Sequence, residues 1–222
     1  MKDVLARLKR IKPDVLVEFR QAYMGPAILQ YGNMIRAADC PADPCANRKR
    51  ICDLRLTSGR TAVHSDMLVW SRDETPENAS RAVLSAIFGV VQYSMVIQRL
   101  PESHRRMVRH WIDFSRMHCD ALLKGGFLPH HPEMQYPLIE SWNDKERIVA
   151  VYSDGIVLPV DVREKAVFVL NASQVSSLVI DVEGEPSEAS AFDTFGAAAG
   201  RIELKNGLNR VSVPVGGYLK MK

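Results

Sequence analysis

The sequence predicts an α/β region followed by an all-β region, because its pattern changes once along the chain. Up to about residue 125, short β-rich runs alternate with amphipathic helical patterns, which is typical of β/α units around a parallel sheet. After Gly126 the helical periodicity disappears, and β-rich runs are separated by Asp-Gly, Asn-Gly and Gly-Gly turns. We therefore expect two domains, an α/β domain over 1–125 and an antiparallel β-sandwich over 126–222.

The first region opens with apolar residues at helical spacing and closes with a long helix between a proline and a glycine. Val4, Leu8 and Ile11 lie on one face of the opening helix, and Pro101 and Gly125 bound the closing one. The elements expected in order are helix 3–12, strand 15–20, strand 33–38, a helix after Pro44, strand 61–66, helix 77–90, strand 92–97 and helix 101–125.

The composition excludes several classes of protein. The chain has 222 residues, 46% of them hydrophobic, which suffices for a sizeable core. A net charge of only +3 gives no reason to expect nucleic acid or an anionic membrane as partner. The longest apolar run, 82–91, is about half of what a bilayer span requires, and the N-terminus has no apolar leader. We expect a cytoplasmic protein whose four cysteines are free thiols.

Several segments resemble the C-terminal part of the family 36 glycoside hydrolases, the α-galactosidase group. They are "KPDVLVEFRQAYMGP", "YGNMIRAADCPAD", "NRKRICDLRLTSGRTAVHSDMLVW" and the β-rich tail. The family has an N-terminal β-sandwich, a central (β/α)8 barrel and a C-terminal antiparallel β domain. The resemblance implies that this chain is a partial TIM barrel of about units five to eight, followed by the last domain.

The resemblance gives Asp39 a catalytic role. Retaining glycosidases use two carboxyl groups, one as nucleophile and the other as general acid and base. The family's acid/base is an Asp that ends the sixth strand in a "W-x-S-D-D" segment, and this position falls on Asp39 in "RAADC", with Cys40 in place of the second Asp. From the residues alone, an Asp before a proline-rich turn is more often a turn former or a helix N-cap.

The second carboxylate has no counterpart in the sequence. In the family the nucleophile is an Asp in a "K-x-D" segment at the end of the fourth strand, and no strand that ends in Lys-x-Asp precedes the strand at 15–20. The resemblance therefore implies a chain that carries the acid/base and lacks its partner. We expect the chain alone to be inactive.

Two arginines and a glutamine are candidates for substrate binding. Arg20 and Gln21 end the first strand, where the family often carries "C-x-x-G-G-x-R", whereas this sequence has "FRQAYMG". Arg20 offers planar donors to sugar hydroxyls or to a carboxylate, and an ion pair within the fold is an equal alternative. Arg36 precedes Asp39 and would either orient that carboxylate or form a salt bridge within the barrel.

His64, Ser65 and Asp66 end the strand at 61–66. His64 aligns with a His in the family's corresponding strand. The three do not form a relay among themselves, because adjacent residues on a strand point to opposite faces. His64 and Asp66 are two residues apart, so they could face one side and support the substrate site.

Other candidates have weaker support. Cys40, Cys45 and Cys52 lack the Cys-x2-Cys spacing of structural zinc sites, so we predict no metal and no cofactor. His130 and His131 are expected in an exposed loop. Each of the three tryptophans, Trp70, Trp111 and Trp142, could stack on a sugar. We expect Trp111 in the core instead, because it lies on a helix beside other apolar residues.

Together these features predict part of a retaining glycoside hydrolase acting on α-galactosides. An oligosaccharide or α-galactoside is the expected ligand, and an upstream barrel half or a second copy is the possible protein partner, with neither nucleic acid nor membrane. Two alternatives remain open. The chain could be a noncatalytic split or truncated remnant, or it could be a carbohydrate-binding module whose active part is the sandwich.

Overall fold

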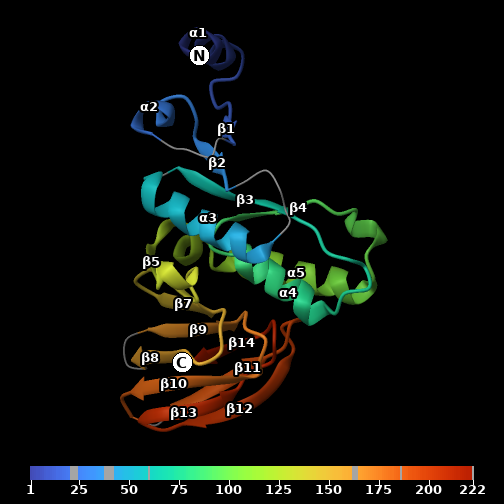
Figure 1. Ribbon diagram of the computed structural model, residues 1–222, viewed down its shortest axis with the longest axis vertical. Coiled ribbons are helices and arrows are strands. Elements are labelled where there is room, and N and C mark those ends of the chain that lie inside the picture. Colours follow the sequence, from blue (N-terminus) through green and yellow to red (C-terminus); the bar gives the residue numbers. More distant parts are fainter. Residues whose placement is uncertain (21–24, 38–42, 60, 162–164, 186, 222) are drawn as a thin grey trace.

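A computed structural model describes residues 1–222 apart from 21–24, 38–42, 60, 162–164, 186 and 222. Figure 1 shows the N-terminal helix at one end of the molecule, a layer of parallel strands and helices in the middle, and a body of β-strands at the other end. The fold is mixed α/β, with a parallel sheet first and mainly antiparallel sheets after it.

In the described part of the chain, four strands form one parallel sheet in the order in which they occur in the sequence. The middle strands are the predicted ones, although the outer two differ in extent. The run 15–20 forms a strand over two residues only, and the last strand begins at Val90 rather than at Gln92. The strands are β1 (Glu18–Phe19), β2 (Met34–Arg36), β3 (Ala62–Leu68) and β4 (Val90–Tyr93).

Helices separate these strands, and their starts follow from local sequence. Pro44 and Pro76 occupy first-turn positions, and the side chains of Asp43 and Thr75 accept hydrogen bonds from the backbone N–H groups that a helix start leaves unpaired. The last long helix ends at Met117 and is followed by a π-turn, so the predicted helix 101–125 is divided. The helices are α1 (Lys2–Ile11), α2 (Pro26–Leu29), α3 (Pro44–Thr57), α4 (Pro76–Ala86) and α5 (Glu102–Met117), with short turns η1 (Ile97–Arg99), η2 (Asp120–Lys124) and η3 (Pro132–Met134).

All described strands from Gly126 onward belong to two other sheets. One has seven strands in the order β12-β11-β14-β9-β7-β6-β5, and the other has three in the order β13-β10-β8. Their bounds are β5 (Gly126–His130), β6 (Leu138–Trp142), β7 (Glu146–Val151), β8 (Val157–Asp161), β9 (Ala166–Asn171), β10 (Ser177–Glu183), β11 (Ser187–Phe192), β12 (Ala198–Leu204), β13 (Gly207–Ser212) and β14 (Tyr218–Met221).

This region is not purely antiparallel, which corrects the prediction. β7 pairs with β9, and β8 pairs with β10, in parallel. The chain passes from β7 in the larger sheet to β8 in the smaller one and then back to β9. Such a crossover brings consecutive strands of one sheet into the same direction. Asp-Gly and Asn-Gly turns reveal where strands end, but they do not reveal which sheet the chain enters next.

The hydrophobic core runs through both regions. Ile35 of β2 and Ile51 of α3 belong to one cluster with Trp111 of α5, Phe168 of β9 and Tyr218 of β14. A second cluster fills the space between the two β-sheets. Burying an apolar side chain of this size stabilises the fold by about 1.5–3 kcal/mol. The helical layer is therefore held between the parallel sheet and the β-rich body, as Figure 1 shows.

Hydrogen bonds also join the helices to the β-rich body. The Ser80 hydroxyl donates to the Gly216 carbonyl at 2.7 Å, and the Tyr152 hydroxyl donates to the Leu84 carbonyl at 2.8 Å.

Within the described residues, no helix combines the length and the apolar character needed to cross a bilayer.

Candidate functional site

The face of the parallel sheet that points away from the helices carries a row of polar side chains. Arg36 lies opposite His64 in the register of β2 and β3, and His64 lies opposite Val90 of β4. Side chains two residues apart share a face, so Glu18 and Gln92 join this row. The alternate residues Ile35 and Val63 are buried in the core on the other face.

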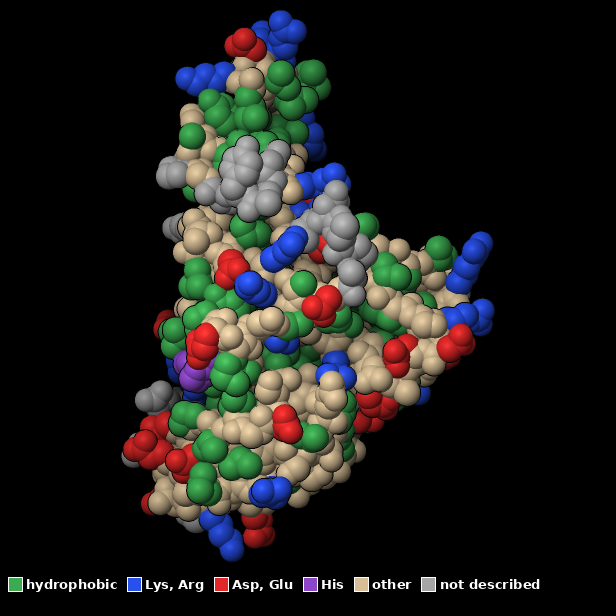
Figure 2. Space-filling view, viewed as in Figure 1, with side chains coloured by type: hydrophobic (Ala, Val, Ile, Leu, Met, Phe, Trp, Pro, Cys, Tyr) green, Lys and Arg blue, Asp and Glu red, His purple; other side chains and the backbone are tan. Residues whose placement is uncertain are grey.

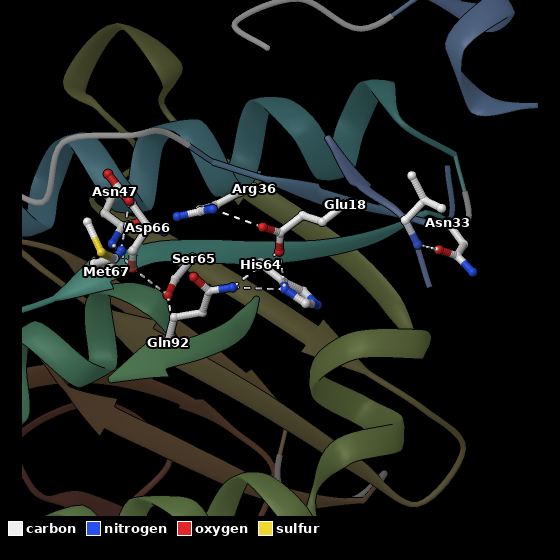
Figure 3. A network of polar contacts seen from close by, with 10 residues as sticks. Glu18, Asn33, Arg36, Asn47, His64, Ser65, Asp66, Met67 and Gln92 are labelled. Carbon is white, nitrogen blue, oxygen red and sulfur yellow. Dashed lines mark hydrogen bonds and ion pairs between the residues drawn. The ribbon is translucent and has the colours of Figure 1, made fainter. Parts of the chain in front are cut away.

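Glu18 is the centre of this row. Its Oε1 accepts a hydrogen bond from Arg36 Nε at 3.1 Å, and its Oε2 lies 2.7 Å from His64 Nδ1. Gln92 Nε2 donates to the same Oε2 at 3.2 Å. The side chains of Glu18, Arg36 and His64 are only 15–20% exposed, so solvent screens these charges less than it would at an open surface. Figure 3 shows the four side chains converging from four strands.

This geometry defines the histidine's chemistry. A carboxylate oxygen only accepts, so the 2.7 Å contact favours a proton on His64 Nδ1, and the Gln92 amide nitrogen 3.0 Å from Nδ1 then donates to Glu18 and not to the ring. In the neutral ring, Nε2 is then the acceptor. A histidine held in this way can accept a proton or a hydroxyl hydrogen bond at Nε2.

Glu18 was not among the residues singled out from the sequence, although a signal was present. In "VLVEFR", Val15, Val17 and Phe19 alternate with Glu18 and Arg20. A strand of a parallel sheet is usually apolar on both faces. An acidic residue inside such a strand therefore indicates that one face of the sheet is polar rather than packed in the core.

Asp66 lies elsewhere than His64. Its backbone N–H donates to Asn47 Oδ1 at 3.0 Å, Asn47 Nδ2 donates to its carbonyl at 3.2 Å, and its carboxylate accepts from the Met67 N–H at 2.8 Å. It is 1% exposed. Figure 3 shows Asp66 beside Asn47 of α3, apart from the group around Glu18.

A β-bulge explains this separation. His64 pairs with Val90, but Met67 pairs with Gln92, so β3 has one residue more than β4 over this stretch. The extra residue breaks the alternation that would have placed His64 and Asp66 on one side. Ser65 uses its hydroxyl to bond the Asp66 carbonyl and the Gln92 N–H, so the three adjacent residues form no relay.

The remaining predicted site residues follow the strand ends. Arg20 comes directly after β1 and is exposed. Arg36 forms the ion pair with Glu18 that was its alternative assignment. Gln21 and Asp39 lie outside the described residues, as does Cys40. In the chain, Asp39 comes three residues after the last residue of β2.

Asp43, the first acidic residue after Asp39 in the chain, has a structural role. Asp43 is the N-cap of α3, and its carboxylate accepts hydrogen bonds from the N–H groups of Cys45 at 2.9 Å and Ala46 at 3.2 Å. An Asp in this position stabilises a helix by satisfying donors that would otherwise lack a partner.

Two of the tryptophans have their indole N–H groups engaged. Trp111 is fully buried and donates to the Ser80 hydroxyl at 2.6 Å, which confirms its assignment to the core. Trp70 donates to His104 Nδ1 at 3.1 Å and meets Tyr93 edge to face. Trp142, on β6, packs against the backbone of Gly126 so closely that a Cβ there would collide with the ring.

The structure also shows the state of three of the cysteines and the position of His130. Cys45, Cys52 and Cys119 are free thiols, and burial raises the pKa of Cys52 to about 12. Among the described side chains, no group of three or more His, Cys, Asp and Glu residues could hold a metal ion. The prediction of an exposed loop is wrong for His130, which lies on β5 with its Nε2 2.7 Å from Glu140 Oε1.

Comparisons with known proteins give similarity in fold only. No family model matches the sequence, and neither does any curated protein. Among solved structures, the galactosidase domain of the α-galactosidase–sucrose kinase AgaSK matches with a TM-score of 0.54 and 12% identity. The match covers 99% of this chain and 31% of that one. A maltogenic amylase from S. marinus matches with a TM-score of 0.42 and 15% identity, over 99% of this chain and 33% of the amylase.

This chain therefore spans about a third of the length of either structure. The resemblance to α-galactosidases that the sequence motifs predict is confirmed at the level of the fold. The chain is similar in fold to part of a galactosidase domain.

Proposed function

We propose that the chain is the second half of the catalytic (β/α)8 barrel, units five to eight, and the following β domain of a retaining glycoside hydrolase that acts on α-galactosides. The observation that carries this proposal is the parallel sheet β1-β2-β3-β4, whose strands follow in sequence order with helices between them and polar side chains on one face. The match to a galactosidase domain over 99% of the chain supports it.

Asp39 is the general acid/base in this proposal. It follows β2 in the chain, and the chemistry of such barrels lies at the C-terminal ends of the strands. It would protonate the leaving oxygen in the first step and activate water in the second. The two rival carboxylates are engaged differently: that of Asp43 caps α3, and that of Asp66 accepts from the Met67 N–H of its own strand.

The row on the open face contributes to substrate binding. Arg20, Gln21, Arg36 and His64 would contact sugar hydroxyls, with Arg36 and His64 oriented by Glu18. An arginine offers paired donors and His64 Nε2 offers an acceptor, which suits the alternating donors and acceptors of a sugar ring. Asp66 supports the site through the two hydrogen bonds between its backbone and the Asn47 side chain of α3.

The nucleophile comes from outside the 222 residues in this account. Double displacement needs a second carboxylate about 5–5.5 Å from the first. The Lys-x-Asp before β1, Lys12-Pro13-Asp14, follows helix α1 and does not end a strand, so in this account an upstream half supplies the nucleophile. The absence of a nucleophile from these residues also supports the second candidate function, a noncatalytic remnant that binds carbohydrate without hydrolysing it.

Reconstitution distinguishes the two functions. The chain is co-expressed with an upstream half that carries a Lys-x-Asp strand end, and hydrolysis of an aryl α-galactoside is followed by ¹H NMR. We expect α-galactose as the first anomer formed from the assembly, and no turnover by the chain alone. Turnover by the pure chain that is lost in Asp39→Ala would show that the nucleophile has been misassigned.

A further inference from the structure

A cavity of about 550 Å³ lies where the helical layer meets the β-rich body, at the edge of the parallel sheet where β3 and β4 begin. Its lining comes from α3, the starts of these two strands, η2 and β5, and its walls are mainly apolar. Sites for small molecules in proteins have this size and this kind of lining. The apolar residues of the walls are Val63, Phe88, Val90, Leu123 and Phe127.

This cavity is separate from the candidate site on the open face of the sheet. The strands are parallel, so the cavity lies at the opposite edge from the end of β2, which Asp39 follows in the chain. Val63 and His64 are adjacent on β3, and their side chains therefore lie on opposite faces of the sheet.

Arg55 of α3 brings a guanidinium to the apolar lining. Its Nη1 donates to the carbonyls of Leu122 at 2.7 Å and Phe88 at 3.0 Å, and its Cζ lies 3.8 Å from the centroid of the Phe127 ring. Nε and Nη2 donate to no side chain or carbonyl of the described residues. These two nitrogens form one edge of the guanidinium, and such an edge binds a carboxylate through two parallel hydrogen bonds. Arg55 is therefore fixed at one nitrogen and can bind an anion with the other two.

The charge of Arg55 has no partner among the described carboxylates. Burial lowers the pKa of this guanidinium to about 10, so it stays protonated at neutral pH although its surroundings disfavour the charge. Lys124 also borders the cavity, but it is exposed and its Nζ lies 2.8 Å from Asp120 Oδ1. Figure 2 shows acidic and basic side chains intermixed on the surface of the middle layer, in contrast to Arg55. A cation removed from water without a partner destabilises the fold, and a bound anion would offset this cost.

We propose that this cavity binds a small monocarboxylate with an apolar or aromatic body. The carboxylate pairs with Nε and Nη2 of Arg55, and the body packs against the apolar walls. The site goes beyond the proposed function, because it lies away from the groups assigned to the sugar and requires no glycosidase activity.

Two other kinds of ligand match the cavity less well. A sugar presents hydroxyl groups that the apolar walls would leave without hydrogen bonds. Inorganic phosphate carries more charge and more acceptor oxygens than one guanidinium edge satisfies, and it has no apolar part to cover the walls. A monocarboxylate needs only one such edge, and its body gains free energy from burial against the walls.

Binding at this place should stabilise the fold. The lining joins α3 and the parallel sheet to β5 of the β-rich body, so one ligand contacts both regions. A ligand that binds only the folded chain raises the free energy of unfolding as its concentration rises above the Kd. The Tm therefore reports binding independently of any catalytic assay.

The test uses the full chain, with phenylbutyrate as the probe and phenylbutyramide, its uncharged analogue of similar shape, as the matched ligand control. Isothermal titration calorimetry measures affinity and stoichiometry, and methyl ¹H–¹³C NMR locates the site. We expect phenylbutyrate to bind one to one, at least tenfold more tightly than phenylbutyramide, acetate or inorganic phosphate, and to raise the Tm. It should shift the methyl signals of Val63, Val90 and Leu123.

Two variants alter the site in different ways. Arg55→Gln removes the charge and should weaken phenylbutyrate binding at least tenfold. Arg99→Gln, the same change at an exposed arginine outside the cavity, should bind like the unchanged chain. Ala62 is exposed and lines the cavity, so Ala62→Phe fills part of it without entering the core and should also weaken binding at least tenfold. The Ala62→Phe protein decides the question even where Arg55→Gln does not fold.

The proposal is overturned by any of four results. These are no binding of phenylbutyrate, equal affinity for phenylbutyramide, binding that survives Arg55→Gln or Ala62→Phe in a folded chain, or an equal loss in Arg99→Gln. Inorganic phosphate that binds as tightly as phenylbutyrate would also overturn it, because the site would then recognise charge alone. Methyl shifts confined to residues outside the cavity would place the ligand elsewhere and contradict the proposal.

Discussion

Glu18 Oε2 lies 2.7 Å from His64 Nδ1 across the open face of the parallel sheet, while Glu18 Oε1 accepts from Arg36 Nε at 3.1 Å. One carboxylate therefore fixes a guanidinium on the next strand and an imidazole on the strand beyond it. Such a pairing sets the ring's tautomer and leaves Nε2 to meet a ligand. Glu18 thus acts as a positioning residue for the two side chains that we assign to substrate.

The first prediction concerns Glu18→Gln. The amide removes the carboxylate charge that Arg36 and His64 face in a partly buried place, so we expect the free energy of unfolding to fall by about 1–3 kcal/mol. The proton on His64 should also redistribute, because the amide no longer requires it on Nδ1. Urea denaturation measures the first effect, and the ¹⁵N chemical shifts of the His64 ring measure the second.

A surface pair of the same type provides the control. His131 Nδ1 lies 3.2 Å from Glu133 Oε1, and both side chains are more than half exposed. Glu133→Gln should leave the stability within about 0.5 kcal/mol of the unchanged protein, as is usual for exposed ion pairs. Equal effects of the two substitutions would mean that Glu18 does not organise the face.

A second prediction tests Asp43 as a helix cap. Asp43→Ala removes the acceptor for the Cys45 and Ala46 N–H groups, so the free energy of unfolding should decrease by about 0.5–2 kcal/mol. Asp43→Ser keeps an acceptor and should recover most of the loss. A neutral Asp43→Ala in thermal or urea melts would release this carboxylate for a catalytic role.

The third prediction is a pH dependence that originates at His110. Burial lowers the pKa of this ring from its ordinary 6.5, opposed by the charges of Asp193 and Asp113. Below about pH 6.5 the unfolded chain binds a proton that the folded chain resists, so folding stability falls as the pH is lowered from 6.5 toward the folded-state pKa. Above pH 6.5 this contribution to stability is fully present.

His110→Phe isolates the effect. The ring stacks on Tyr218 with an interplanar angle of 8°, an arrangement that phenylalanine can keep. The difference in unfolding free energy between the two proteins should change between pH 7.5 and 5 in favour of the phenylalanine variant. A constant difference over that range would exclude His110 as the source.

Cysteine reactivity supplies the fourth prediction. The thiolate is the nucleophilic form, and burial raises the pKa of Cys52 to about 12. In the native protein at pH 8, iodoacetamide should label the partly exposed Cys45 and Cys119 and leave Cys52 unmodified until urea is added. Peptide mapping by mass spectrometry reports each site, and native labelling of Cys52 at the rate of Cys45 would contradict its burial.

The alternation of strands and helices was predictable because local pattern controls it. Pro44 and Pro76 set helix starts, and "TAVHSD" gave β3. The run "AIFGVV" was harder, because apolar residues alone fit a helix or a buried strand. In the structure the helix ends at Ala86 and the strand begins at Val90, where β-branched residues follow Gly89.

Long-range features were not predictable from such patterns. The bulge in β3 separates His64 from Asp66 through pairing with β4, a strand more than twenty residues away. The ion pair of Glu18 with Arg36 depends on the register of β1 and β2, and the parallel pair of β7 and β9 depends on a crossover between sheets. Each is a property of tertiary contacts, whereas the candidate Asp39 came from a resemblance in motif.

The central claim is that Asp39 is the general acid/base, and azide rescue in the reconstituted barrel tests this claim most directly. With an activated aryl α-galactoside the first step needs little acid assistance, so Asp39→Ala should accumulate the glycosyl-enzyme, and azide, which needs no base, should restore turnover as a glycosyl azide of retained configuration. Asp43→Ala and Asp66→Ala should show no rescue. Rescue of Asp66→Ala by azide, with Asp39→Ala unaffected, would place the acid/base on β3 and contradict the account.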